Sequence, residues 1–414
     1  MAAKNFQHKM KFSAVSSIFL VSLTLSFFKW DISYASLPPA EVSEEEAEKI
    51  EAAPSEEWLK KLDKSRQEFA DRYGTYLGFL FHYDRQFILS AKNDKGRSAE
   101  VVYWNLEVVQ RLWPGAALNA ELETDRGKGV DKFLPTFSVF NTNSGDNVDF
   151  YIPQLYLEQN FCSEKGLLLA GKLDTSDWFD GNAVAEDGDT QFLSCVLVNN
   201  VAIPFPSKGL GAVLKFQPYA WVYLETAAAT AEASVTKTGL GDGFNSQFFI
   251  TELGFSPVFR QLQGNYRFIF HLTHDRLEYV DESASKNDTA GFALSFDQQI
   301  TRRISLFARY GFQNPKVRDI QYFWSVGGQL TEPFAGRKYD CLGAAVAQSI
   351  TGKDYRLYNG AGTASAETLW EVYYSYDFNH FLVFTPNIQV VHNPDADRTL
   401  STEVVAGIRV ICAF

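Results

Sequence analysis

Long hydrophobic runs are scarce in this 414-residue chain, and the only long one lies at its start, from Phe12 to Phe28. Lysines precede that run, and a small-residue cleavage sequence ending at Ala35 follows it. This order predicts a secretory signal peptide over residues 1–35, with a membrane anchor helix as the weaker alternative because the run is short. No later run approaches the roughly 20 apolar residues that a membrane-spanning helix needs.

Cysteine is also rare, with four residues spread widely over the chain: Cys162, Cys195, Cys341 and Cys412. Their spacing contains no Cys-x-x-Cys pair, so it does not indicate a zinc or redox site. An exported chain is permitted to form disulfides. We expect mostly free thiols, with a Cys162–Cys195 bridge as the alternative.

Positive charge is in deficit. The formal net charge is −12, and it becomes −15 once residues 1–35, with four lysines and one aspartate, are removed. A nucleic-acid partner requires a basic surface, so the charge balance argues against one.

Motifs for catalysis or metal binding are missing as well. There is no G-x-S-x-G nucleophile elbow. His271 and His274 are three residues apart, which places them on opposite faces of a strand. The aspartates between residues 174 and 189 are interpreted as a solvated acidic loop, with calcium binding as the alternative. We therefore predict neither an enzyme nor a metal or organic cofactor.

Alternation of apolar and polar residues is what the sequence does contain, and its clearest instance is the last stretch, Glu403 to Phe414. Every second residue from Val404 to Phe414 is apolar, while Glu403 and Arg409 fall on the other face. A strand with one apolar face and a few charged residues on the other face is typical of a barrel wall that separates lipid from water. We expect Phe414 to act as a membrane-assembly signal.

The alternating pattern recurs about sixteen times, as a closed transmembrane barrel requires. The predicted strands span residues 73–85, 99–112, 116–125, 151–161, 166–174, 209–217, 219–228, 247–256, 264–274, 289–299, 302–312, 321–331, 339–350, 366–378, 381–392 and 403–414. The predicted fold is all-β, a transmembrane up-and-down antiparallel β-barrel of about 16 strands over residues 72–414.

The connections between these strands alternate between short and long, which places short turns on one rim and long loops on the other. The longest loop, residues 175–208, contains apolar segments that are too hydrophobic for a loop exposed to solvent. We expect this loop to fold back into the lumen and narrow it.

Residues 36–71 differ from the barrel. They form an acidic stretch followed by an amphipathic helix with Ser55 as its predicted N-cap and acidic residues in its first turn. We expect a periplasmic helical segment, either as a solvated tail or packed under the barrel mouth through the face that carries Trp58.

Charged and amide side chains are expected on the inner wall. Sugars present hydroxyl groups that need such partners, and C–H faces that stack on aromatic rings such as Trp178, Phe179 or Trp324. The predicted inward residues are Lys172, Asp174, Lys215, Gln217, Glu252, Arg267, Asp297, Gln299, Arg303, Arg309, Glu371, Gln389, Glu403 and Arg409. The alternative role of each of these residues is to keep the lumen hydrated and to stabilise its wall through salt bridges.

Several motifs follow one another in an order that resembles a known family. They are GKLDTSDWFDGN (171–182), VNNVAIPFPSKGLGAVLKFQP (198–218), LFARYGFQNP (306–315), EPFAGRKYDCLGAAVA (332–347), ETLWEVYYSYDF (367–378), TPNIQVVHNPDADR (385–398) and EVVAGIRVICAF (403–414). Together they resemble the OprB-like carbohydrate-selective porins of Gram-negative outer membranes. The acidic segment 40–57 and Cys412 depart from the usual pattern of that family.

The resemblance implies a sixteen-stranded barrel whose inward loops form an eyelet for passive diffusion of mono- and oligosaccharides. It implies eyelet residues Asp174, Trp178 and Asp180, and wall residues Arg309, Glu371, Asn387, Gln389 and Arg409. A general, weakly cation-preferring porin is the alternative function, followed by an outer-membrane enzyme or adhesin. The expected location is the outer membrane, and the expected partners are sugars, lipid and lipopolysaccharide, and the barrel-assembly machinery. Homotrimer formation is left open.

Overall fold

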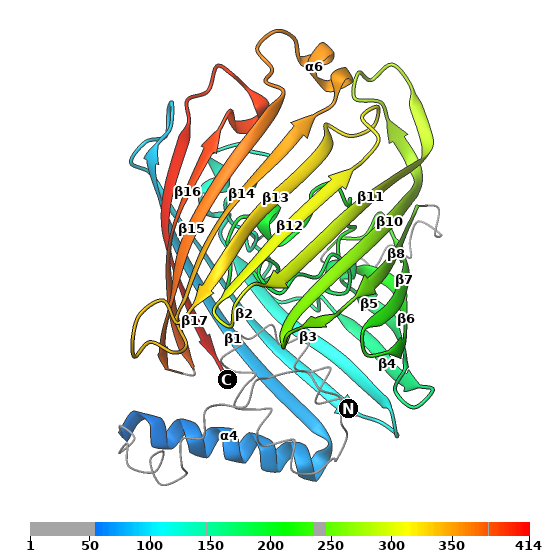
Figure 1. Cartoon of the computed structure of the whole chain (residues 1–414), viewed down its shortest axis with the longest axis vertical. Coiled ribbons are helices and arrows are strands. Elements are labelled where there is room, and N and C mark those ends of the chain that lie inside the picture. Colours follow the sequence, from blue (N-terminus) through cyan, green and yellow to red (C-terminus); the bar gives the residue numbers. More distant parts are fainter. Residues whose placement is uncertain (1–53, 146, 235–245, 380) are drawn as a thin grey trace.

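The computed structural model describes residues 54–145, 147–234, 246–379 and 381–414 (Figure 1). The predicted signal peptide and the acidic stretch up to residue 53 lie outside these ranges. Within them, no helix combines the length and the apolar character needed to cross a membrane.

One antiparallel sheet contains every strand of the described residues. The strands are β1 (Thr75–Ser90), β2 (Ser98–Arg111), β3 (Ala116–Arg126), β4 (Leu155–Phe161), β5 (Gly166–Leu173), β6 (Gly209–Tyr219), β7 (Val222–Thr230), β8 (Gln247–Phe255), β9 (Val258–Phe259), β10 (Leu262–Glu278), β11 (Ser285–Gln299), β12 (Ile304–Phe312), β13 (Ile320–Thr331), β14 (Cys341–Thr351), β15 (Ala366–Asn379), β16 (Leu382–His392) and β17 (Glu403–Ala413). Each full-length strand pairs with its sequence neighbour, and β9 is a two-residue piece beside the start of β10. The prediction of a sixteen-stranded barrel is confirmed.

Pairing of the first and last strands closes the barrel. Asp84 of β1 lies opposite Arg409 of β17, and the register runs from Leu80 to Ser90. At its end, Phe414 exchanges two backbone hydrogen bonds with Phe79, and its ring packs against the rings of Phe79 and Phe381. Closure leaves no free sheet edge, which is the condition for a β-structure in lipid.

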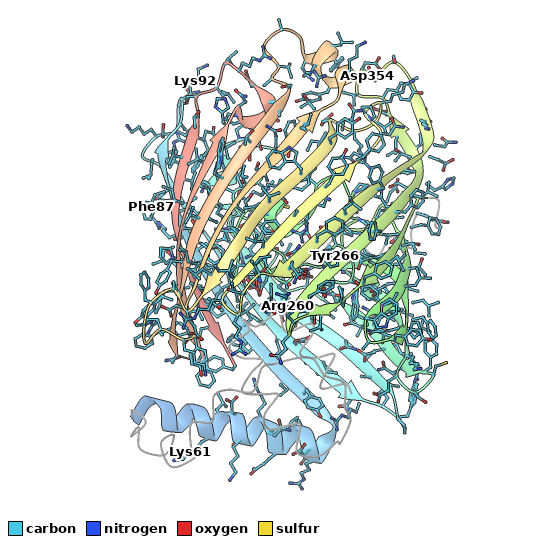
Figure 2. The ribbon with its side chains drawn as sticks, viewed as in Figure 1. Lys61, Phe87, Lys92, Arg260, Tyr266 and Asp354 are labelled. Carbon is cyan, nitrogen blue, oxygen red and sulfur yellow. The ribbon has the colours of Figure 1, made fainter. Side chains whose placement is uncertain are left out.

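Successive side chains alternate between the outer surface and the interior. On β10, Phe268 and Phe270 are exposed outside, while Ile269 and His271 are buried inside. His274 faces outward, where it contacts Asp288, so the prediction that it lies opposite His271 is confirmed. In the side-chain view, Phe87 and Tyr266 mark the outer surface (Figure 2).

Short turns and long loops lie at opposite ends of the barrel, as predicted. Lys92 and Asp354 mark the end with the long loops, and Arg260 marks the end with the short turns (Figure 2). The long loops include the helices α6 (Lys353–Asn359) and η4 (Pro394–Ala396). The start of β1 and the end of β17 lie at the short-turn end (Figure 1).

Parts of two long loops fold into the barrel instead of projecting from it. Loop 127–154 contains η1 (Gly129–Lys132), and loop 174–208 contains η2 (Thr175–Asp177) and α5 (Cys195–Val198). Phe192 of the second loop packs against the inward rings of Phe307 and Tyr373 in a buried apolar cluster. The expectation that the longest loop enters the lumen is therefore confirmed.

Helix α4 (Pro54–Tyr73) lies beneath the short-turn end of the barrel (Figure 1). Ala70, near its C-terminal end, is buried with Tyr76, Val109 and Ala117 of the wall. A helix is present in this region as predicted, and its C-terminal end packs against the barrel. The predicted packing through the face that carries Trp58 lies outside the described side chains.

All four cysteines lie in the described residues, and all four are free thiols. The Cys162–Cys195 bridge is therefore not formed.

Candidate functional site

A polar cavity of about 510 Å³ lies between one side of the barrel wall and the two inward loops. The inner faces of β1, β2 and β3 form one side, with residues such as Tyr103, Asn105 and Glu121. Residues 142–145 of loop 127–154 and residues 186–190 of loop 174–208 form the other side. The buried apolar clusters occupy other parts of the interior, so the cavity is off-centre.

The charge of this cavity is strongly one-sided. Of the described residues that line it, nine are carboxylates and only Lys208 is a cation. The carboxylates are Glu107, Glu121, Glu123, Asp125, Asp174, Asp177, Glu186, Asp187 and Asp189. A low-dielectric wall lined by charge of one sign focuses the field inside the opening.

Lys208 ends loop 174–208, and its Nζ lies 3.6 Å from Oε2 of Glu123. Burial lowers its pKa, but the carboxylates of Glu123 and Asp174 outweigh burial and hold the pKa above its usual range. The ammonium group therefore stays charged and neutralises part of the acidic wall.

Asp174 is the predicted site residue that does line the cavity. It is half-buried at the start of η2, where its carboxylate accepts hydrogen bonds from the backbone N–H and the hydroxyl of Ser176. This N-cap fixes where loop 174–208 leaves β5.

The predicted basic residues of the wall hold the loops and do not line the cavity. Arg309 is fully buried, lies 3.2 Å from the carboxylate of Asp180, and donates to the backbone oxygens of Leu197 and Asp180 at 2.8 and 2.9 Å. Arg409 donates to the backbone oxygens of Gly188 and Gln191 at 2.5 and 2.7 Å. Both guanidinium groups therefore bind the backbone of loop 174–208.

Arg267 is similarly engaged. Its guanidinium lies 2.9 Å from Asp297 and 3.8 Å from Glu252, both on the inner wall. Glu252 in turn accepts a hydrogen bond from the backbone N–H of Asp180. This group connects the wall to loop 174–208 on the side formed by β8, β10 and β11.

Glu371, Asn387 and Gln389 face inward from β15 and β16 and are buried. Glu371 accepts from the backbone N–H groups of Leu193 and Ser194 at 2.7 and 3.0 Å. The amide of Gln389 donates to Glu371 and to the backbone oxygen of Phe140, which belongs to the other inward loop. These contacts anchor both loops, and none of the three residues lines the cavity.

Two predicted site residues lie elsewhere than expected. Lys172 alternates with the inward Leu173, so it faces outward with Leu168 and donates to the backbone oxygen of Ile152. The prediction of a lumen position for Lys172 is therefore wrong, because strand alternation places it on the lipid side. Trp178 is only 8% exposed and packs in an apolar cluster with Phe179, so its ring does not line the cavity.

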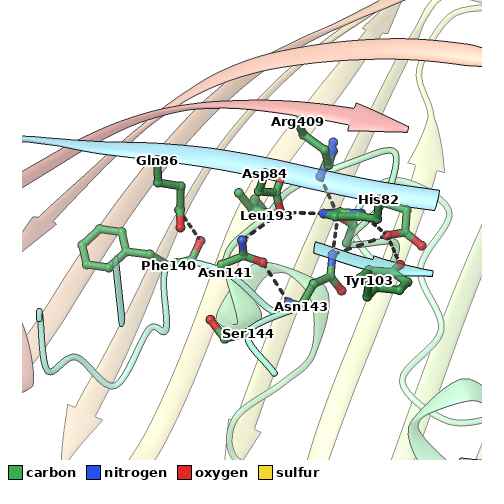
Figure 3. A network of polar contacts seen from close by, with 12 residues as sticks. His82, Asp84, Gln86, Tyr103, Phe140, Asn141, Asn143, Ser144, Leu193 and Arg409 are labelled. Atoms are coloured by element: carbon green, nitrogen blue, oxygen red, sulfur yellow. Dashed lines mark hydrogen bonds and ion pairs between the residues drawn. The ribbon is translucent and has the colours of Figure 1, made fainter. Parts of the chain in front are cut away.

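A polar network links the wall to both loops beside the cavity (Figure 3). His82 of β1 lies between Asp84 and Asp189, and its ring stacks on Tyr103 with 4.7 Å between centroids. The Tyr103 hydroxyl donates to Asp189, and Asn141 donates to Asp84. Burial raises the pKa of Asp189, but the hydrogen bond and charge of His82 outweigh burial and hold it below its usual range.

The prediction missed most of the residues that line the cavity. Glu107, Glu121, Glu123 and Asp125 share the inward face of β2 and β3, so alternation alone could have identified them. The interpretation of Asp187 and Asp189 as part of a solvated acidic loop is wrong, because both line the cavity inside the barrel. Within the described ranges, no three His, Cys, Asp or Glu side chains are placed to hold a metal ion.

A closed antiparallel barrel with inward loops that narrow a polar interior defines a porin. Comparisons with known proteins give the family. The family model for "Carbohydrate-selective porin, OprB family" matches residues 93–414, and the chain belongs to that family.

The relatives differ widely from this chain in sequence. Porin AaxA of Chlamydia abortus is 24% identical over 56% of this chain and 50% of its own length. Porin AaxA of Chlamydia felis is 21% identical over 72% of this chain and 63% of its own length. This chain therefore matches only about half to two thirds of these relatives.

Among solved structures, the high-pH structure of Pseudomonas putida OprB matches with a TM-score of 0.76. The identity is 18%, and the match covers 84% of this chain and 96% of that one. At this identity the likeness shows the fold, which is the barrel described above. The porin family and the barrel fold are typical of channels rather than enzymes. Both imply an outer-membrane location.

Proposed function

We propose that this porin lets sugars diffuse passively across the outer membrane. The observation that carries the proposal is the cavity lining, which combines carboxylates and amides with the tyrosines Tyr103 and Tyr151. Sugar hydroxyls both donate and accept hydrogen bonds, and sugar C–H faces pack on aromatic rings. The family description, carbohydrate-selective porin, supports the same substrate class.

The test is single-channel current through the refolded protein in a planar bilayer, titrated with glucose, a longer maltooligosaccharide and a charged organic solute of similar size. We expect saturable current block by the sugars, because a site lined with hydroxyl-matching groups retains them briefly. Open channels that no sugar blocks would contradict sugar selectivity and leave a general porin.

A second candidate function, a cation-preferring porin, is favoured by the nine carboxylates and single ammonium group among the described cavity residues. In a KCl gradient we expect a reversal potential of the sign given by K⁺ preference. Replacing Glu121 and Glu123 together with glutamine should move that potential toward zero, because two negative charges leave the cavity lining.

The matched control is Glu100→Gln, which removes a carboxylate from the exposed outer face of β2, where Glu100 pairs with Arg85. This variant should keep the wild-type reversal potential. Anion preference in the wild-type channel, or equal shifts in both variants, would contradict the cation-preferring function. Sugar block and cation preference are separate readouts, so one can fail while the other stands.

The proposal extends to partners. Outer-membrane lipid and lipopolysaccharide would contact the apolar outer face, the barrel-assembly machinery would engage the last strand, and three copies could associate through their walls. The distinction between a monomer and a homotrimer is testable by the mass of the native protein in mild detergent.

A further inference from the structure

His82 is a fully buried imidazole whose two ring nitrogens both face carboxylate oxygens. Nε2 lies 2.5 Å from Oδ2 of Asp84, and Nδ1 lies 2.9 Å from Oδ1 of Asp189. Asp84 belongs to the same strand, β1, whereas Asp189 belongs to loop 174–208, which is 107 residues away in sequence. The ring therefore bridges the barrel wall and the loop (Figure 3).

The protonation state follows from this geometry. A neutral imidazole has one N–H, so it can donate to only one carboxylate, and its other nitrogen would then point a lone pair at the second. Donation to both carboxylates requires the imidazolium form. Charge balance agrees, since one cation between two anions is better matched than a neutral ring would be.

Arg409 is the other cation near this group, and its charge also acts on Asp189. Arg409 of β17 lies opposite Asp84, but its two terminal nitrogens donate to the backbone oxygens of Gly188 and Gln191. Tyr103 of β2 donates to Asp189, while Glu123 and Asp187 add further negative charge near Tyr103. The neighbours from loop 127–154 are the neutral amides of Asn141 and Asn143.

The bridged loop segment forms part of the cavity wall. Residues 186–190, which include Asp189, line the cavity together with Glu121 and Glu123. The position of this segment therefore sets one boundary of the cavity. Asp84 holds the other inward loop through Asn141, so the same group connects both loops to β1.

We propose that His82, as an imidazolium, is the positioning residue that holds the cavity-lining segment 186–190 against the barrel wall. Loss of one ring proton at alkaline pH leaves a lone pair facing a carboxylate and breaks the contact between His82 and Asp189, while Tyr103 still donates to Asp189 and Arg409 still holds Gly188. Asp189 then shifts away from His82 within a segment that stays attached at Gly188, and the width of the cavity changes. This inference rests on the proposed channel function only for its current readout.

The first experiment measures single-channel conductance and glucose block of the refolded protein from about pH 6 to about pH 10, a range that begins near the ordinary pKa of histidine. We expect one alkaline step in conductance, accompanied by weaker glucose block. His82→Gln should lose the step and show the alkaline conductance throughout, because an amide donates from a single nitrogen, whereas the imidazolium donates to the two carboxylates from two separate ring nitrogens.

Two further variants separate positioning from general stability. Asp189→Asn should also lose the step, because the new amide donates to a neutral ring and the bridge persists at every pH. Its conductance is compared only with itself across the pH range, since Asp189 is one of the nine carboxylates that line the cavity. His271→Gln is the matched control, since His271 is a buried, inward-facing histidine of β10 outside the cavity lining. That variant should retain the alkaline step.

A readout independent of current keeps the proposal testable if the channel is closed or if His82→Gln fails to fold. Nitrogen-15 NMR of histidine-labelled wild-type protein in detergent reports whether each ring carries one or two protons. We expect His82 to be doubly protonated at neutral pH. A singly protonated His82 there, or an alkaline step that survives in His82→Gln, would overturn the proposal. Folded protein that passes neither ions nor sugars would instead overturn the proposed function alone.

Discussion

Deletion of Phe414, or its replacement by alanine, is expected to remove most of the folded barrel from the outer membrane while leaving the pore of any surviving channel unchanged. Phe414 makes two backbone hydrogen bonds with Phe79, and its ring packs against Phe79 and Phe381 at the seam where β17 meets β1. An unclosed seam exposes unpaired backbone groups to lipid, which costs several kcal/mol per group.

The measurement is the amount of heat-modifiable protein in the outer-membrane fraction, together with the single-channel conductance of whatever assembles. Phe378→Ala is the matched control, because Phe378 is an exposed aromatic residue near the same end of β15, with 60% of its surface accessible. It should assemble at nearly the wild-type level. Wild-type amounts of the Phe414 variants in the outer membrane would show that the contacts of Phe414 at the β1–β17 seam are not needed for assembly.

Replacement of Arg309 by methionine is expected to release loop 174–208 and to produce a larger, noisier conductance. Arg309 and Asp180 form a fully buried ion pair, and removal of one partner from such a pair typically costs about 3–5 kcal/mol. The two backbone oxygens that Arg309 binds would also lose their donor. Single-channel recordings and thermal unfolding both report the change.

The same variant should depend on pH in a defined direction. Burial raises the pKa of Asp180 to about 6, even though the Arg309 guanidinium acts to lower it. Without Arg309, the carboxylate is buried and unpaired when charged, and its pKa rises further. The folded state then binds a proton that the unfolded chain releases, so stability increases as pH falls through that pKa.

The conductance of Arg309→Met should therefore approach the wild-type value in acid. Arg303→Met, which removes an exposed guanidinium paired with Glu332 at a turn, should be unaffected. The double variant Arg309→Met with Asp180→Asn should recover part of the lost stability, because no unpaired charge remains. A quiet, pH-independent channel in the single variant would show that other contacts suffice to dock the loop.

The barrel was predictable because its determinants are local and repeat along the chain. Alternation marks each strand and turn composition marks each rim, so the predicted strands agree with the observed ones to within a few residues in most cases. Strand β4 is an exception, since it begins at Leu155 and not at residue 151. Pro153 has no backbone N–H to donate to the ladder, and Tyr151 keeps only an isolated bridge to Glu123.

The cavity was less predictable because alternation gives the face of a residue but not what covers it. Arg309 and Glu121 both point inward, yet a loop covers the first, and the second faces the cavity. Whether an inward residue is covered by a loop or faces the cavity depends on contacts between residues more than a hundred positions apart in sequence. Trp178 shows the same limit, since its place in an eyelet motif gave no sign that its ring is buried.

The anchors of loop 174–208 bind mainly backbone atoms of the loop. Arg409 and Arg309 reach carbonyl oxygens, and Glu371 reaches two amide N–H groups. Backbone groups are the same for every residue type except proline, so substitutions at cavity-facing positions such as Asp187 leave these anchors in place. Apart from Asp180 and Asp189, whose side chains contact Arg309 and His82, the side chains of this loop can therefore be exchanged, by evolution or in a designed nanopore, to change what passes without altering the wall.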